Sequence, residues 1–187
     1  MPFIFLSTMT VIAYHNGKIL ADKAMIYPLY SGHYPLLEKG SKFIFNEEVG
    51  TVFAFSGKAP TKGECFYIAA AIKIYSQMAS DVDKKEVDEK VLERRVNTLM
   101  EIQSKFKEKI YIIGTDGKNV FAGTTLSQLQ KLHKDKPFAY GSHALTYMML
   151  ADKGYKPEQI YSTISKRANV VTKEFNYIDI NNHMVLK

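Results

Sequence analysis

The residue types that most often bind metals or act as nucleophiles are few and scattered in this chain. The five histidines show no paired metal-ligand spacing: His15, His33, His133, His143 and His183. The single cysteine, Cys65, lies on the apolar stripe of a predicted helix, which favours packing over a reactive thiol. The glycines form no phosphate-binding loop. We therefore expect no metal site and no cofactor.

Hydroxyl, carboxylate and ammonium groups stand instead at the ends of predicted strands, at Thr10, Asp22 and Lys42. A threonine hydroxyl is a weak nucleophile, but a free α-amine beside it can act as general base, because the amine's pKa lies near neutrality. A lysine ammonium at the mouth of a strand can lower the pKa of a nearby hydroxyl. Each residue also has an ordinary interpretation, as a β-prone threonine, a turn carboxylate and a solvated lysine.

A predicted hairpin positions the first two of these residues. Asn16-Gly17 separates two β-prone runs, residues 10–14 and 19–22, and Asn-Gly is the strongest short-range hairpin signal. Pairing around this turn would put Val11 roughly opposite Asp22 and Thr10 at the strand mouth. Further strands are predicted over residues 41–46, 51–56, 109–114, 119–122, 138–140 and 175–180.

Four helices complete the predicted order. Cys65, Ile68, Ile72 and Tyr75 share one helical face, and a second helix is expected from about residue 83 to 107. Two more are expected over about residues 143–153 and 157–171, and Pro157 suits a first helical turn. Strands grouped with strands and helices grouped in pairs predict an α+β fold, an αββα four-layer sandwich.

The composition is that of an ordinary globular chain: 187 residues, 46% hydrophobic, 24% charged and a net charge of +6. This length predicts one domain. No run approaches the roughly 18–20 apolar residues of a membrane span, so we expect no membrane association. One cysteine is compatible with a reducing cytoplasm. The lysines are spread along the chain, which makes a nucleic-acid partner the least favoured interpretation.

Six short stretches of the chain match motifs of one protein family in that family's order. They are residues 9–14, Asn16-Gly17, Ala21-Asp22, residues 40–44, residues 53–57 and residues 140–142. Together they resemble the proteasome β-type subunits of the N-terminal-nucleophile (Ntn) hydrolases, in the style of bacterial HslV and above all of its short bacteriophage-encoded relatives. The resemblance covers about residues 9–180. It implies a threonine peptidase without a cofactor that acts on peptides or unfolded proteins. It also implies homo-oligomeric rings in a cytoplasm, or in a virion if the protein is phage-encoded.

The resemblance also implies roles for the strand-end residues. Thr10 would be the N-terminal nucleophile, with Thr8 as second choice. Lys42 would lie beside the threonine and lower the pKa of its hydroxyl, and Asp22 would hold that lysine.

Two further positions match the family at strand-to-helix junctions. Backbone N–H groups at Ser56 and Gly57 would form an oxyanion hole, although Gly57 could simply make the turn. Ser142 would bond the terminal amine and relay protons. Its ordinary interpretation is an N-cap for the helix that begins near His143.

The chain departs from the family in two places. Asn169 stands where the family carries an aspartate, and an amide cannot supply the negative charge that supports the terminal ammonium. Residues 1–9 precede Thr10 as an extension or propeptide, before a domain over residues 10–187, and Thr10 has no free amine until they are removed. Translation from Met9 followed by methionine removal would also expose Thr10. The alternative function is a catalytically silent structural or assembly protein, perhaps of a phage particle.

Overall fold

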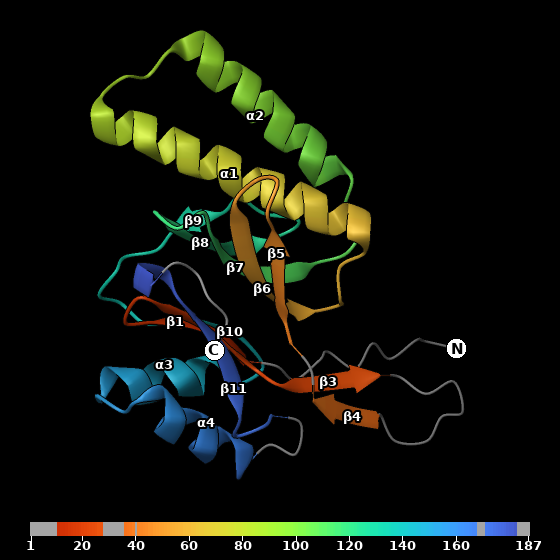
Figure 1. Cartoon of the computed structure of the whole chain (residues 1–187), viewed down its shortest axis with the longest axis vertical. Helices are drawn as coiled ribbons and strands as arrows, with labels where there is room; N and C mark the ends of the chain where they lie inside the picture. Colours follow the sequence, from red (N-terminus) through yellow and green to blue (C-terminus); the bar gives the residue numbers. More distant parts are fainter. Residues whose placement is uncertain (1–10, 28–35, 40, 168–170, 183–187) are drawn as a thin grey trace.

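Two antiparallel sheets lie face to face between two pairs of helices in the computed structural model of this protein, which describes residues 11–27, 36–39, 41–167 and 171–182 (Figure 1). From one side to the other, the layers are a helix pair, a five-stranded sheet, a four-stranded sheet and a second helix pair. The predicted αββα sandwich is therefore confirmed.

The four-stranded sheet has the order β10-β1-β2-β11. Its strands are β1 (Val11–His15), β2 (Lys18–Asp22), β10 (Phe138–Gly141) and β11 (Phe175–Asp179). The hairpin predicted at Asn16-Gly17 joins β1 to β2, and both turn residues have positive φ, 50° and 75°. Ile12 pairs with Ala21, so the register puts Val11 level with Asp22.

The five-stranded sheet has the order β5-β6-β7-β8-β9. Its strands are β5 (Phe43–Asn46), β6 (Thr51–Gly57), β7 (Ile110–Thr115), β8 (Val120–Thr124) and β9 (Gln130–Lys131). Every neighbouring pair is antiparallel. The Asp116-Gly117 turn joins β7 to β8 as expected, with Gly117 at a φ of 89°.

The first helix pair is α1 (Lys62–Lys84) and α2 (Glu89–Ser104). Thr61 and Glu64 form a capping box at the start of α1. The sequence placed the start of the second helix near residue 83, which is wrong. Residue 83 is still in α1, because Lys85 adopts the left-handed conformation that ends this helix and Asp88 caps the next one.

The second helix pair is α3 (Ala144–Asp152) and α4 (Pro157–Ser165), with Pro157 at the first helical position. The helix α4 ends at Ser165, earlier than the predicted end near residue 171. A short 3-10 helix, η1 (Ile180–Asn182), follows β11, and the amide of Ile180 donates to the carbonyl of Gly17.

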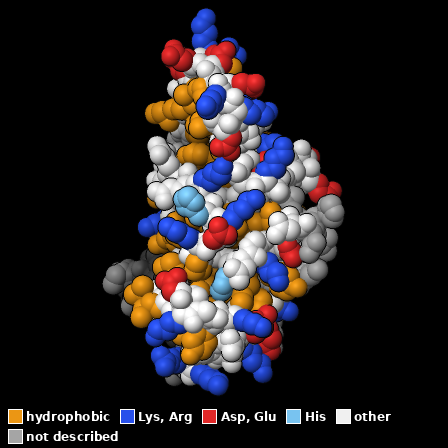
Figure 2. Space-filling model, turned by 90° about the vertical axis from the view of Figure 1, so that its left-hand side faces the viewer, with side chains coloured by type: hydrophobic (Ala, Val, Ile, Leu, Met, Phe, Trp, Pro, Cys, Tyr) orange, Lys and Arg blue, Asp and Glu red, His pale blue; other side chains and the backbone are white. Residues whose placement is uncertain are grey.

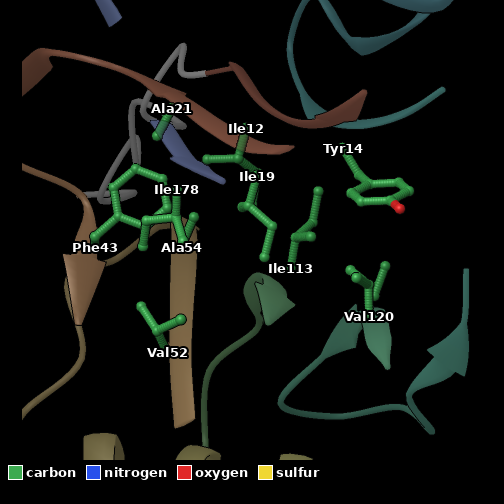
Figure 3. Close-up of a cluster of buried hydrophobic side chains, with 11 residues drawn as sticks. Ile12, Tyr14, Ile19, Ala21, Phe43, Val52, Ala54, Ile113, Val120 and Ile178 are labelled. Carbon is green, nitrogen blue, oxygen red and sulfur yellow. The ribbon is translucent and has the colours of Figure 1, made fainter. Parts of the chain in front are cut away.

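Three apolar layers hold the sandwich together. The alternation along each strand sends side chains to opposite faces, so Ile12 and Tyr14 enter the core between the sheets, while Val11 and Ala13 pack on α3 and α4. Figure 3 shows the inter-sheet core, with side chains from both sheets pointing toward one another. The third layer lies between the five-stranded sheet and the helices α1 and α2, and it includes Phe53.

Three short strands escaped sequence analysis. The strands β3 (Ala24–Tyr27) and β4 (Leu36–Lys39) pair with each other as a separate ribbon, and β9 has two residues. The prolines and glycine between residues 28 and 35 indicated only a loose stretch, because a four-residue strand shows too little alternation to stand out from its surroundings.

One glycine in β7 tests how tightly the helix layer packs on the sheet. A Cβ added at Gly114 would press against Ile72 Cδ1 and lie 2.9 Å from Phe53 Cβ. We expect Gly114→Ala to lower the free energy of unfolding by about 1–3 kcal/mol through overpacking. Gly63 in α1 has no neighbour within 4 Å of the same added atom, so Gly63→Ala should leave stability unchanged or raise it. Urea unfolding compares the two, and equal midpoints would contradict this packing.

Candidate functional site

A buried ion pair joins the two sheets at one end of the sandwich. Lys42 Nζ, just before β5, donates to Asp22 Oδ1 at the end of β2 over 2.5 Å. Both residues are almost completely buried, at 4% and 1% exposure. The ordinary interpretations of these residues, a solvated lysine and a turn carboxylate, are therefore wrong. The expected approach of Asp22 to Lys42 is observed.

Burial dominates the electrostatics of this pair. It raises the pKa of Asp22 to about 6, while the Lys42 ammonium opposes that shift. Burial also lowers the pKa of Lys42, and Asp22 opposes this shift in turn. The backbone amides of Val11 and Thr172 face the Asp22 carboxylate and, like Lys42, oppose the rise in its pKa. Among the described residues, Asp22 Oδ2 has no donor that meets full hydrogen-bond geometry. Each charge is thus held in a poorly solvated place mainly by the other.

The backbone at the start of β1 is fixed from three sides. Val11 is fully buried, and it pairs with Gly141 at the end of β10. The hydroxyl of Tyr161 in α4 donates to the carbonyl of Val11 over 3.2 Å. On the remaining side lies the Asp22 carboxylate. The residue that directly follows Thr10 is therefore rigidly placed beside the ion pair.

The end of β6 reaches the same region. The amide of Phe55 donates to the carbonyl of Lys42 over 3.2 Å, so Lys42 is tied to β6 one residue before Ser56. Ser56 is buried, and Gly57 has a φ of 101°, which a residue with a side chain rarely adopts. Since Phe43 pairs with Ala54, the Ser56-Gly57 junction lies at the same end of the five-stranded sheet as Lys42.

The remaining candidates are placed less decisively. Ser142 follows Gly141 at the end of β10, and its side chain is exposed. The N-cap of α3 is His143, without a side-chain hydrogen bond, so the interpretation of Ser142 as a helix cap is wrong. Thr10 and Asn169 lie outside the described residues. The expected distance of about 4 Å between Thr10 Oγ and Lys42 Nζ therefore stays a prediction.

Two residues of this region were not assigned a role from the sequence. The ring of Tyr161 stacks on Phe175 with centroids 4.7 Å apart, and burial, together with the nearby charge of Asp22, raises the pKa of Tyr161. Thr172 accepts a hydrogen bond from the amide of Lys23 and donates one to the carbonyl of Glu174. The family resemblance offered a signal for Thr172 alone, since the matching position of the proteasome-like subunits often carries serine or tyrosine.

The single cysteine packs in a helix layer, as its place on an apolar stripe predicted. Cys65 is half-buried against the helix-covered core, and burial raises the pKa of its thiol. On the face shown in Figure 2, Lys and Arg side chains are spread from end to end with Asp and Glu among them, and they form no single basic strip. Among the described residues, no helix has the length and apolar character needed to cross a membrane.

No protein-family model and no curated protein matches the sequence. Solved structures do match the fold. Eukaryotic HslV from Trypanosoma brucei aligns with a TM-score of 0.51 at 9% identity, over 90% of this chain and 96% of that chain. An Anbu (Gly-1) mutant from Hyphomicrobium sp. strain MC1 aligns with a TM-score of 0.54 at 11% identity, over 95% and 86% of the two chains.

A third similar structure is BPH from Thiobacillus denitrificans in complex with epoxomicin. It aligns with a TM-score of 0.50 at 12% identity, over 90% of this chain and 95% of that chain. At these identities the likeness concerns the fold alone. The chain thus has the α+β fold of the proteasome-like Ntn hydrolases HslV, Anbu and BPH, with two antiparallel sheets between helices.

Proposed function

We propose that this protein is a threonine-type amide hydrolase subunit whose nucleophile is Thr10, exposed as the first residue by removal of residues 1–9. The observation that carries the proposal is the buried Lys42–Asp22 pair beside Val11, the residue that follows Thr10. A buried pair costs desolvation free energy and is a weak source of stability. Its position at the strand mouth that the proteasome-like fold uses supports a catalytic role.

In the proposed reaction, Thr10 Oγ attacks the carbonyl carbon of a peptide bond while the α-amine of Thr10 accepts the hydroxyl proton. The Lys42 ammonium lowers the pKa of the hydroxyl, and Asp22 keeps that ammonium charged in its buried place. The backbone N–H groups at Ser56 and Gly57 stabilise the oxyanion. The amine then returns the proton to the leaving nitrogen, and water hydrolyses the acyl ester. In this scheme Ser142 assists proton transfer at the terminal amine.

The proposal extends to substrate and assembly. We infer that the substrate is a peptide or an unfolded protein, as the resemblance to the proteasome-like subunits implies. Copies of the chain would form a closed homo-oligomeric ring that encloses the sites. From the resemblance to the short phage relatives we also infer that the protein is located in a cytoplasm, or in a virion if it is phage-encoded.

Intact-mass measurement of the purified protein tests the proposal directly. A mature chain that begins at Thr10 supports the enzyme, whereas retention of Met1 or Pro2 contradicts maturation at this position. Because the structurally similar BPH is seen in complex with epoxomicin, we also expect a chain that begins at Thr10 to bind this compound. Thr10→Ala in the same shortened chain should weaken that binding.

A second candidate function is a catalytically silent structural or assembly protein. The observation that favours it is Asn169, which stands where the family has an aspartate and removes one negative charge from the proposed site. A fold can persist after its chemistry is lost. A shortened chain that assembles into rings but hydrolyses no peptide would establish this second function.

The titration of Asp22 predicts an acid limit to activity. As the pH falls through about 6, Asp22 takes up a proton, the Lys42 ammonium loses its counter-charge, and the hydrolysis rate of the chain beginning at Thr10 should fall. The pKa of Asp22 is about 6 in the folded chain and 3.8 in the unfolded chain, so the folded chain binds this proton more tightly. Protonation of Asp22 as the pH falls from about 6 to 3.8 therefore favours folding. Loss of rate would therefore not report unfolding.

A pH–rate profile with a parallel record of circular dichroism measures this limit. Asp22→Asn provides the control, because it has no proton to gain near pH 6 and should give a low rate without this step. If the rate of Asp22→Asn still fell near pH 6, the titrating group would be a residue other than Asp22.

A further inference from the structure

A cavity of about 250 Å³ lies at the far end of β1 from Val11, lined in part by Asn16 of the β1–β2 turn. The β1–β2 hairpin, the first turn of α4 and the strand β11 form its walls, and Figure 1 shows these elements next to one another. The residues used in the argument are His15, Lys18, Lys156, Glu158, Phe175 and Tyr177. None of them belongs to the proposed hydrolytic site, so this cavity calls for an explanation of its own.

The polar centre of the cavity is a buried histidine. His15 is 7% exposed, and its Nδ1 lies 3.2 Å from the hydroxyl of Tyr147 in α3. Burial keeps the Tyr147 phenol protonated by raising its pKa, so the hydroxyl can donate to Nδ1. The neutral imidazole then carries its hydrogen on Nε2, an assignment made from this hydrogen bond. Nε2–H is the donor that remains for a ligand.

The charges around the cavity favour a negative ligand. Lys18 Nζ lies over the Tyr177 ring, 4.8 Å from its centroid, and Lys156 directly precedes α4, whose N-terminus carries positive partial charge. Glu158 is the one acidic side chain among the described residues that line the cavity. With His15 neutral, the lining holds two lysines against one glutamate, a positive surplus, while Asp179 pairs opposite Lys18 in the sheet without lining the cavity.

The rest of the lining is apolar. Leu20 is buried in the sheet, and the rings of Phe175 and Tyr177 lie on the same strand two positions apart, so both face the helices. The volume is below the roughly 300–1,000 Å³ of sites that take drug-sized ligands, so only a small molecule fits.

We propose that this cavity binds a small amphipathic organic anion, a carboxylate with an aromatic or branched aliphatic body. Its acid group accepts hydrogen bonds from His15 Nε2–H and from Lys18, and its body packs on Phe175 and Tyr177. The polar end of the cavity, at His15 and Lys18, lies at the opposite end of the β1–β2 hairpin from the proposed peptidase centre, whereas Phe175 in its apolar lining pairs with Asp22.

Benzoate is the probe, with neutral benzamide and positively charged benzylammonium as matched controls. We expect benzoate to bind at millimolar concentration or below and to shift the His15 imidazole resonances, with benzamide binding about tenfold more weakly or worse. Lys18→Met should weaken benzoate binding about tenfold. Lys153→Met, which changes a lysine at the end of α3 outside the lining, should leave it unchanged. Calorimetry gives the affinities, and unfolding midpoints show that each variant is folded.

Glu158→Gln decides the sign of the ligand's charge. Removal of the acidic side chain should strengthen benzoate binding, because the lysines and His15 then act without an internal competitor. Tight binding of benzylammonium that Glu158→Gln weakens would overturn the proposal in favour of a cation site. Absence of benzoate binding at millimolar concentration, or equal affinity for benzoate and benzamide, would also overturn it.

Discussion

Removal of residues 1–9 is expected to raise the peptidase rate of this protein by at least about 10²-fold. In the full-length chain the nitrogen of Thr10 is part of a peptide bond and cannot accept a proton. Lys42 is a poor replacement as general base, because its ammonium donates to the Asp22 carboxylate, even though burial lowers the pKa of Lys42. Loss of a positioned base typically lowers a rate by about 10²–10⁴-fold, and restoring one should return a similar factor.

The measurement compares cleavage of an unfolded protein by the full-length chain, the chain that begins at Thr10, and the latter with Thr10→Ala. Activity should appear only in the second. Thr10→Ser is the conservative control, because it retains a hydroxyl next to a free amine. Equal rates for the full-length and shortened chains would identify a nucleophile other than Thr10, and would also exclude Thr8, which the shortened chain lacks. Inactivity of every form would favour the structural alternative.

Removing one partner of the buried ion pair is expected to destabilise the fold more than any surface substitution. Asp22→Ala removes both the negative charge and the hydrogen-bond acceptor that face the buried Lys42 ammonium, and we expect the free energy of unfolding to fall by about 3–5 kcal/mol at neutral pH. Lys42→Met should lower the free energy of unfolding by a similar amount, because the buried Asp22 carboxylate then loses the ammonium that it accepts a hydrogen bond from. It should also abolish hydrolysis by the chain that begins at Thr10, because no positive charge then lowers the pKa of the nucleophile.

The double variant Lys42→Met with Asp22→Leu tests this interpretation. Both buried charges are gone, so its loss of stability should be smaller than that of either single variant. The exposed pair between Lys131 and Asp83, 3.2 Å apart, is the matched control. Asp83→Ala should lower the free energy of unfolding by less than about 1 kcal/mol. Similar losses for Asp22→Ala and Asp83→Ala in urea unfolding would contradict the electrostatic account of the site.

The element order and the first hairpin could be predicted because their signals are local. Asn16-Gly17 needs positive φ at neighbouring positions, and the turn they form sets the register that puts Val11 level with Asp22. Helix identity followed from apolar spacing in the same way. Helix ends were less accurate, since the left-handed cap at Lys85 depends on a residue type that rarely takes this conformation.

The catalytic candidates were reached through family resemblance, because spacing along the chain gives no reason to connect Lys42 with Asp22. Sequence pattern alone favoured a solvated lysine, and the tertiary structure reversed that interpretation by burying both groups. The hydrogen bond from the Phe55 amide to the Lys42 carbonyl was likewise decided by the tertiary structure, since it forms only when β5 and β6 pair.

The sequence by itself determined the αββα order of elements and the turn that brings Thr10's neighbour to Asp22, because turn residues and apolar periodicity act over a few positions. Only the tertiary structure decided what surrounds that point. Tyr161 reaches the Val11 carbonyl from 150 positions away, and the cavity beside His15 unites a hairpin, a helix start and the last strand. Such contacts depend on how the layers pack and on which polar groups lose water there, and no local pattern records either.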